Sequence, residues 1–361
     1  MENKYITYML SSSFILLLGI IFLNYTVDPG NIYHSQTSSV KKFVQSLVHS
    51  KCGLWWPDGS FNERAVKKEL IAYGAGDCVV IGSSHVMQLG NNNLNGVWHN
   101  ICKHILNLGV SGAGIEDHFI YAYLASRNNH VKKIILGIDP WTFAYNKDER
   151  YHFLDKQYHK ARAVIIGRSQ KKYNHNTRSL VLNLINLQYT KRSLLQLTSL
   201  WKVNKKLFNY KNFVSVDNAH GGKYPLFLPD GSLVYSSSFI SESLKNNAGI
   251  TDSIYKTDGE INQENAVSDY KILIIWLIKN HIQPVLLMTP YHPSSWKNKD
   301  SSNHKAFHAT SKIVHQLANE FHLQVIGSYQ PILAGCMPTE FYDFMHPTRT
   351  CINKLNLRNY G

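Results

Sequence analysis

The chain is poor in cysteine and in charged residues, and each shortage excludes a class of protein. Its 361 residues include five Cys, at positions 52, 78, 102, 336 and 351. Five are too few for a disulfide-dense scaffold, and no Cys-x-x-Cys pair offers a structural zinc site. Charged residues make up 17% and hydrophobic residues 44%, and the second figure excludes wholesale disorder. The 22 Gly and 11 Pro follow no short period, so the chain is not collagen-like.

Motifs for nucleotides and nucleic acids are also missing. Gly109 and Gly112 lack the further glycines of a dinucleotide fingerprint, and no phosphate-binding loop occurs. The chain carries 38 Lys and Arg against 24 Asp and Glu, a net charge of +14, yet no nucleic-acid-binding motif accompanies this charge. We therefore expect no cofactor, no metal ion and no nucleic-acid partner.

One long apolar segment stands at the N-terminus. No charged residue occurs from Tyr5 to Leu23, and this length is close to what a helix needs to cross a bilayer. Bulky residues follow the segment where signal peptidase needs small ones, so we favour an uncleaved anchor over residues 1–27; a cleaved signal peptide is the alternative. Asp28 on the far flank favours a body outside the cytoplasm, on the periplasmic side in a Gram-negative cell.

The positive charge is concentrated in the middle of the chain. Between Arg150 and Lys223 there are 15 Lys and Arg and two acids, so this segment carries +13 of the net charge. Within it, apolar residues at helical spacing predict a basic amphipathic helix over residues 179–208. Such a helix packs its apolar stripe on the body of the protein, or it binds an anionic membrane or polymer, and both interpretations stay open.

The rest of the chain alternates between strands and helices. Strands are predicted over 77–82, 101–108, 131–138, 284–288 and 323–326, and helices over 115–126, 266–280 and 305–321. This order predicts an α/β fold, a mostly parallel sheet with helices on both faces. The expected organisation is an anchor over 1–27, a lead-in over 28–75 and an α/β domain over 76–361. A basic insertion over 150–265 interrupts that domain, with a hairpin turn at Asp230-Gly231.

Polar residues follow the predicted strands, where α/β proteins collect their functional groups. Gly82-Ser83-Ser84-His85 follows the first strand, and the second leads into a segment from Asn107 to Gly112. Asp139 follows the third strand, His292 the fourth, and Asp343 precedes His346 near the end of the chain. The candidate residues that line a site are therefore Ser83, His85, Asn107, Asp139 and His292, beside a catalytic set of Ser84, Asp343 and His346.

These residue types are what acyl transfer through a serine requires. A serine hydroxyl needs a base within hydrogen-bond reach, and His346 can be that base while Asp343 fixes its tautomer. Backbone amides at Ser84 and Gly112 can stabilise the developing oxyanion. Each part has an ordinary alternative: Ser83 or Ser84 as a helix cap, Asp343 and His346 as an accidental pair, and His292 as a loop histidine.

Three segments resemble blocks of the SGNH (GDSL-like) hydrolase superfamily. VVIGSSH resembles the first block, with Ser83 in place of the usual Asp, NLGVSG the second, and FYDFMHP the closing block. The anchor, the GSS segment and the large insertion are most similar to the membrane-anchored branch that includes the D-alanyl transfer protein DltD and alginate O-acetylation proteins. The resemblance implies a three-layer α/β/α sandwich with Ser84 as nucleophile, Ser84 and Gly112 as oxyanion donors, His346 as base and Asp343 as its partner.

One position departs from the superfamily pattern. The third block normally ends in an Asn whose amide donates to the oxyanion, and Asp139 stands in the matching place in LGIDPW. An ionised carboxylate accepts hydrogen bonds and repels an oxyanion. Three explanations stay open: Asp139 is protonated, binds another group, or faces away from the site.

The leading hypothesis is a membrane-anchored, extracytoplasmic serine acyl esterase or O-acyltransferase acting on an acylated carbohydrate or envelope glycopolymer. The sequence does not separate hydrolase from transferase, since both use the same triad. For a transferase, the resemblance implies a multi-pass membrane acyltransferase as partner. The alternative is a non-catalytic binding or assembly factor that holds an anionic envelope polymer through Lys202, Lys205 and Lys206.

Overall fold

The structure is a computed structural model that describes most of the chain. The described residues are 2–28, 33, 37–50, 53–55, 62–74, 76–91, 94, 96–167, 181–182, 184–203, 225–235, 237–246 and 262–359. They form two compact units. The first comprises Met1–Ser39, Pro57–Asn62 and Gln170–Phe213, and the second comprises Val40–Trp56, Glu63–Ser169 and Val214–Gly361. The segment from 150 to 265, expected to be one insertion, is thus divided between the two units.

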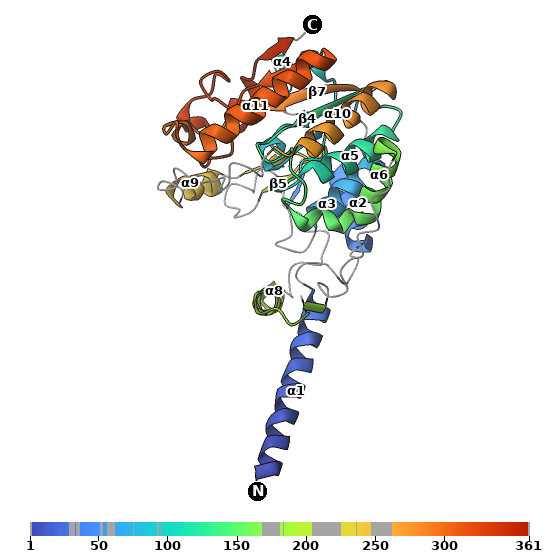
Figure 1. The fold of residues 1–361 in the computed structure, drawn as a ribbon, viewed down its shortest axis with the longest axis vertical. Coiled ribbons are helices and arrows are strands. Elements are labelled where there is room, and N and C mark those ends of the chain that lie inside the picture. The colour runs from blue at the N-terminus through green and yellow to red at the C-terminus, as the bar shows by residue number, and fades with distance from the viewer. Residues whose placement is uncertain are drawn as a thin grey trace. The chain divides into compact units, whose positions relative to one another are not determined.

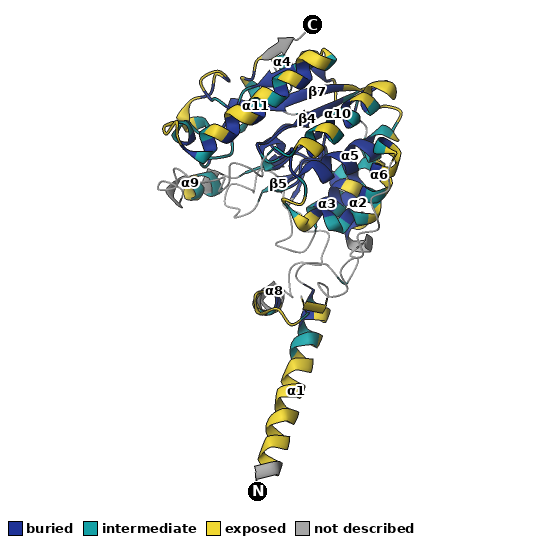
Figure 2. Cartoon of the chain, viewed as in Figure 1, coloured by how far each residue is buried: buried dark blue, intermediate teal, exposed yellow. Residues whose placement is uncertain are grey.

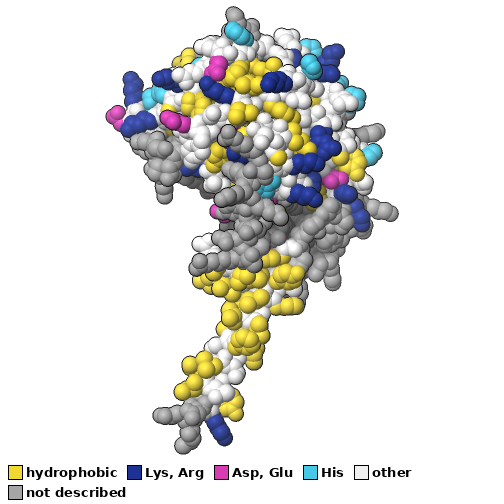
Figure 3. All heavy atoms as spheres, turned by 45° about the vertical axis from the view of Figure 1, so that its right-hand side comes forward, with side chains coloured by type: hydrophobic (Ala, Val, Ile, Leu, Met, Phe, Trp, Pro, Cys, Tyr) yellow, Lys and Arg dark blue, Asp and Glu magenta, His cyan; other side chains and the backbone are white. Residues whose placement is uncertain are grey.

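The first unit contains a long apolar helix. Helix α1 (Glu2–Val27) is long and apolar enough over Lys4–Val27 to cross a membrane, a property that an N-terminal signal sequence shares. Its side chains are exposed along most of its length (Figure 2), and hydrophobic atoms cover it (Figure 3). Helix α8 (Leu187–Val203) packs beside the end of α1. It begins later than the helix predicted over 179–208, because the Asn186 side chain accepts from the backbone amides of Gln188 and Tyr189 and caps it there; residues 204–208 lie outside the described residues.

The second unit is built on a six-stranded, mostly parallel sheet. Its order is β3 (Ile105–Asn107), β2 (Cys78–Ile81), β4 (Lys133–Gly137), β7 (Gln283–Met288), β8 (Gln324–Gly327) and β9 (Leu357–Asn359). Only β9 runs antiparallel to its neighbour. The parallel strands are mostly apolar and buried (Figure 2), which is typical of parallel sheets. The α/β class and the mostly parallel sheet therefore agree with the prediction.

The strand order sets the place where a site can form. The chain goes from β2 to β3 on one side of the sheet and then returns to β4 on the other side of β2. Open α/β sheets bind ligands at such a reversal, outside the carboxyl ends of the two strands, which here are β2 and β4. Ser84 follows β2 and Asp139 follows β4, so both lie at that edge of the sheet.

Helices connect the strands and cover the sheet. Helix α5 (Ile115–Ser126) packs on β2, α10 (Glu264–Lys279) on β7, and α11 (Ser302–Phe321) on β7 and β8 (Figure 1). Ser301 caps the start of α11, and His322 ends it in a left-handed conformation. The other helices are α2 (Thr37–Val48), α3 (Glu63–Tyr73), α4 (Val97–Ile101), α6 (Asp155–Ile166), α9 (Ser237–Asn246) and α12 (Arg349–Asn353), with the 3₁₀ helices η1 (Ser84–Val86), η3 (Glu149–Leu154), η5 (Pro293–Trp296) and η6 (Pro338–Glu340).

A small antiparallel sheet lies in the same unit. It consists of β1 (Leu54–Trp55), β5 (Leu226–Phe227) and β6 (Leu233–Val234). The turn between β5 and β6 contains the predicted Asp230-Gly231 pair. The buried Lys67 of α3 donates from Nζ to the carbonyls of Asn107 and Gly231, at 2.9 and 2.6 Å. This ammonium group fixes the turn to the end of β3.

The structure differs from the prediction at two places near the sheet. The strand expected over 101–108 is shortened to β3, because α4 takes up its first residue and a disulfide joins Cys102 to Cys78. Strand β9, which was not predicted, follows α12 and pairs with β8. A second disulfide joins Cys336 to Cys351, and Cys52 lies outside the described residues.

Candidate active site

The turn after β2 presents Ser84 at the carboxyl edge of the sheet. Gly82 lies close to the backbone of Gly137 on β4, so a larger residue would push the two strand ends apart. Ser83 is buried, and its hydroxyl accepts from the backbone amide of His85, so Ser83 caps η1. Capping therefore falls to Ser83, and the partly buried side chain of Ser84 is free for another contact.

Ser84, His346 and Asp343 form a continuous hydrogen-bonded relay. Ser84 Oγ lies 2.8 Å from His346 Nε2, and His346 Nδ1 lies 2.7 Å from Asp343 Oδ2. A carboxylate only accepts hydrogen bonds, so the proton of the neutral imidazole sits on Nδ1. Nε2 is then an acceptor aimed at the serine hydroxyl. The structure thus brings together the three residues that the sequence predicted as a catalytic set.

The loop that carries the base is held by its own backbone. Asp343 Oδ1 accepts from the amides of Met345 and His346, at 2.7 and 2.6 Å, while its other oxygen binds the imidazole. The His346 ring stacks against the Tyr342 ring, with centroids 5.2 Å apart, and against the His85 ring at 4.6 Å. Both ends of the Asp343–His346 dyad are therefore fixed before any ligand binds.

The surroundings shift the pKa values of the dyad in the directions that a base needs. Burial lowers the pKa of His346 below its ordinary value of 6.5, and the hydrogen bond with Asp343 offsets part of this effect. Burial raises the pKa of Asp343, but hydrogen bonds from the imidazole and from two backbone amides outweigh it, so the net pKa lies below the ordinary value of 3.8. At neutral pH the pair is a neutral imidazole beside a carboxylate.

Asp139 is engaged with His85. Its Oδ1 lies 2.8 Å from His85 Nδ1, and both side chains are almost completely buried. The Ser83 hydroxyl lies 2.9 Å from the same nitrogen, and the Tyr291 hydroxyl lies 3.4 Å from Asp139. Of the three explanations left open for Asp139, the contacts agree with the second, that it binds another group. Among the described residues, His85 Nε2 is buried without a hydrogen-bond partner.

Asn107 and His292 have structural partners of their own. The Asn107 amide donates to the carbonyls of Val86 and Leu89, both at 2.7 Å, and its oxygen accepts from the amide of Gly109 at 2.8 Å. Asn107 thus fixes the turn that follows Ser84 and has no polar atom left for a ligand. His292 caps η5, and its backbone amide donates to the carbonyl of Phe344 on the loop of the base.

Gly112 belongs to a loop that α3 holds in place. It has φ +61°, and a Cβ there would overlap the ion pair of Asp148 and Arg150. Within the described residues no contact links Gly112 to the Ser84 hydroxyl. The backbone amides of Ser84 and Gly112 have no hydrogen-bond partner there either.

The supports of that loop were not predicted from the sequence. Glu63 accepts from the backbone amide and the hydroxyl of Ser111, at 2.7 and 2.9 Å. Arg64 forms a buried two-fold ion pair with Asp117 of α5, at 2.8 and 2.7 Å. Glu63 and Arg64 lie in the segment expected to be a lead-in. The one sequence signal that points to them is the acidic Glu63, a residue type that is favoured in the first turn of a helix.

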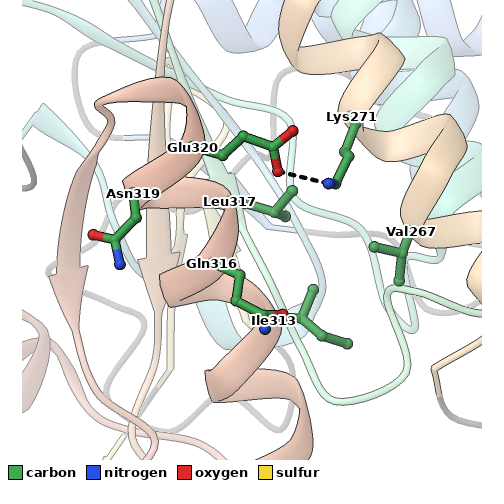
Figure 4. A pocket seen from close by; sticks show the side chains of 7 residues that line it. All are labelled: Val267, Lys271, Ile313, Gln316, Leu317, Asn319 and Glu320. Carbon is green, nitrogen blue, oxygen red and sulfur yellow. Dashed lines mark hydrogen bonds and ion pairs between the residues drawn. The ribbon is translucent and has the colours of Figure 1, made fainter.

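A separate cavity lies between α10 and α11. Its volume is about 610 Å³, and the Lys271–Glu320 ion pair, 2.6 Å long, crosses it (Figure 4). Its lining consists of Val267, Lys271, Ile313, Gln316, Leu317, Asn319 and Glu320. Its only ionisable side chains, Lys271 and Glu320, are paired with each other at the surface, and we assign the cavity no function. No group of three or more His, Cys, Asp or Glu in the described part of the chain could hold a metal ion.

The arrangement around Ser84 can activate a hydroxyl group. Its imidazole acceptor, oriented by a carboxylate and partly sheltered from water, is the geometry through which serine enzymes transfer acyl groups. His85 and Asp139 form a second imidazole–carboxylate pair beside His346, and the Tyr342 ring packs against the His346 ring. Comparison of the chain with protein-family models and with curated protein sequences found no match in either.

Proposed function

We propose that the protein is a membrane-anchored serine acyl esterase or O-acyltransferase that acts on a cell-envelope carbohydrate outside the cytoplasm. The observation that carries this proposal is the relay from Ser84 Oγ through His346 to Asp343. The relay lies at the point where the order of the strands reverses, which is the usual place for a site in this class of sheet.

The first half of the reaction forms an acyl-serine. Ser84 Oγ attacks the ester carbonyl carbon while His346 Nε2 takes the hydroxyl proton, and Asp343 stabilises the imidazolium that results. The tetrahedral intermediate then breaks the bond between the carbonyl carbon and the leaving alkoxide. His346 returns the proton to this alkoxide, so an alcohol departs and the acyl group stays on Ser84.

The second half releases the acyl group to an acceptor. Water or a sugar hydroxyl gives its proton to His346 and attacks the acyl-serine carbonyl carbon. The bond between this carbon and Ser84 Oγ then breaks, and His346 returns the proton to Ser84 Oγ. The acceptor alone decides whether the outcome is hydrolysis or transfer. The relay serves both outcomes equally.

The oxyanion has to be stabilised without Asp139. That carboxylate is bound to His85 and cannot supply the amide donor that the superfamily places there. The unpartnered backbone amides of Ser84 and Gly112 are the donors in our proposal. Removing one such donor in an enzyme of this kind costs about 3 kcal/mol in the barrier.

Further features support the fold family and the compartment that we propose. The parallel strands follow the order of doubly wound sheets, in which helices cover both faces, as the three-layer α/β/α sandwich of SGNH hydrolases requires. Helix α1 is apolar enough to anchor the chain. The disulfides Cys78–Cys102 and Cys336–Cys351 are typical of proteins in oxidising compartments.

The test is covalent labelling of the full chain in detergent with a fluorophosphonate, read by intact mass. We expect one adduct on the wild type and none on Ser84→Ala, with labelling at least a hundred-fold slower in His346→Ala. Ser83→Ala is the matched control, since Ser83 is one residue away but caps η1, and it should still label. Labelling that persists in Ser84→Ala, or a folded wild type that never labels, would overturn the proposal. Adding a polysaccharide acceptor to the acylated enzyme then separates transfer from hydrolysis.

The alternative function gains no support from the described residues. The side chains of Lys202, Lys205 and Lys206, which would hold an anionic polymer, lie outside them. An Asp in the place of the Asn of the superfamily also fits a non-catalytic protein, but the contact of Asp139 with His85 gives this carboxylate a partner beside the relay. We therefore propose the serine acyl esterase or O-acyltransferase rather than the polymer-binding factor.

A further inference from the structure

Helix α8 presents two different faces, one bound to the end of α1 and one exposed and apolar. We infer that α8 is an interfacial helix that lies on the membrane surface beside the point where α1 leaves the bilayer, with its leucine face in the lipid. The inference concerns the first compact unit alone. It depends on α1 crossing a membrane and is independent of any chemistry at Ser84.

Buried polar contacts hold α8 against α1. Asn24 of α1 is fully buried, its amide donates to the Thr190 hydroxyl at 2.8 Å, and its oxygen accepts from the Ser193 hydroxyl at 2.8 Å. Just after the end of α1, four residues beyond Asn24, the Asp28 carboxylate accepts from the Tyr189 hydroxyl at 2.7 Å. Tyr189 and Ser193 are four residues apart and share one helix face. This face of α8 is therefore polar and bound to α1.

The opposite face of α8 is apolar and exposed. Leu187, Leu194 and Leu195 lie on it, and their exposed fractions are 83%, 50% and 60%. At 100° per residue, each of these three positions lies about 120° or more from the centre of the face that carries Tyr189 and Ser193. The residues just before the helix extend the surface with three further exposed apolar side chains, Val181, Leu182 and Ile185. Lys191, also exposed, stands among the leucines, where a long basic side chain can reach toward lipid phosphates.

The position of α8 along α1 matches the edge of a bilayer. A hydrocarbon core about 30 Å thick takes about 20 helical residues, which from Tyr5 reach Asn24. Asn24 is the first residue of α1 in the polar contact with α8. Figure 1 shows α8 end on beside the last turns of α1, so the axis of α8 runs across that of α1. A helix that crosses a membrane-spanning helix in this way, at this depth, lies along the interface.

Lipid is the occupant that these observations favour. Helix α1 also carries exposed apolar side chains, among them Leu18 and Phe22, which the hydrocarbon core has to cover in any case. The buried amide of Asn24 would be unfavourable in hydrocarbon, and the contacts from α8 satisfy it at the boundary. The same contacts require α1 to stay attached to the mature chain, since a cleaved signal peptide would leave Tyr189 and Ser193 without these partners.

The test uses site-specific photocrosslinking in the full chain. Benzoylphenylalanine is placed at Leu194 or Leu187, and the protein is incorporated into vesicles of 70% phosphatidylcholine and 30% phosphatidylglycerol. After irradiation, lipid adducts are measured by mass spectrometry. Leu16, an exposed residue in the middle of α1, is the positive control, and Tyr189, on the face of α8 that is bound to α1, is the matched control.

We expect lipid adducts at Leu194 and Leu187 with at least one third of the yield at Leu16, and at least a five-fold lower yield at Tyr189. Asn24→Ala should reduce the yield at Leu194 at least three-fold and leave the yield at Leu16 unchanged. Adducts at Leu16 but none at Leu194, or crosslinks from Leu194 to a protein in place of lipid, would overturn the inference. None of these outcomes depends on acylation of Ser84, which the fluorophosphonate experiment tests separately.

Discussion

Replacing Asp343 by Asn should nearly abolish acylation of Ser84 while leaving the loop of the base in place. Asp343 Oδ1 accepts from the backbone amides of Met345 and His346. In the variant only the carbonyl oxygen of Asn can take this place, because its NH₂ group is a donor. That NH₂ group must then face His346 Nδ1. The imidazole can accept from it only by moving its own proton to Nε2, where the proton blocks transfer from Ser84.

The size of the effect follows from losing the correct tautomer. In serine enzymes this change lowers the rate by about 10³- to 10⁴-fold, which is about 4 to 5.5 kcal/mol in the barrier. The geometry here gives no reason for a smaller loss. The carboxylate lies 2.7 Å from Nδ1, and the described residues offer His346 Nδ1 no second acceptor.

The assay is the second-order rate of fluorophosphonate labelling for wild type, Asp343→Asn and Asp139→Asn. The last variant is the matched control. It removes a carboxylate charge beside the other imidazole of the site, that of His85, and it breaks no hydrogen bond in the relay. We expect Asp139→Asn to stay within about ten-fold of the wild type. A rate for Asp343→Asn within ten-fold of the wild type, or an equal loss in both variants, would refute the assignment of His346 as the base oriented by Asp343.

Three further predictions concern pH and stability. The labelling rate should rise with pH with a midpoint below 6.5, since burial lowers the pKa of His346; a midpoint at 6.5 or above would contradict this. Burial raises the pKa of Glu116 to about 7. Between pH 4.5, the ordinary pKa of Glu, and pH 7, the native state therefore binds more protons than the unfolded state. The free energy of unfolding should fall by about 3 kcal/mol as the pH rises through that range. Urea denaturation at pH 5 and 8 should find this fall in the wild type and not in Glu116→Gln. Gly231→Ala should lower the free energy of unfolding by about 2 to 4 kcal/mol, because φ is +82° and a Cβ would overlap the Asn107 carbonyl. An unchanged melting temperature would contradict that overlap.

The sequence predicts the elements whose signal is local. Helix α5 occupies the predicted residues, and β2, β7 and β8 differ from the prediction by one or two residues, because continuous apolar runs between turn residues define them. Strand β9 escapes prediction because three residues in Leu-Arg-Asn are too few to show a period. The start of β3 was misplaced because α4 is held by a disulfide, and pairing between Cys102 and Cys78 carries no sequence signal.

The candidate site shows the same limit more sharply. Asp343 and His346 are three residues apart, so their contact is a local expectation. Ser84 is 262 positions from His346, and placing the two together required the rule for parallel sheets and the family resemblance. The contact of His85 with Asp139 depends on the register of β2 beside β4 and on side-chain directions, which no pattern in the sequence encodes.

The disulfide between Cys336 and Cys351 closes a segment that contains both Asp343 and His346. Closing a loop of 15 residues restricts the unfolded chain by about 3 kcal/mol, so the bond favours the ordered form of that segment. A newly made chain in a reducing cytosol would lack this restriction. In the function that we propose, maturation of the site would then be coupled to export, and the enzyme would spare acylated metabolites in the cell that makes it.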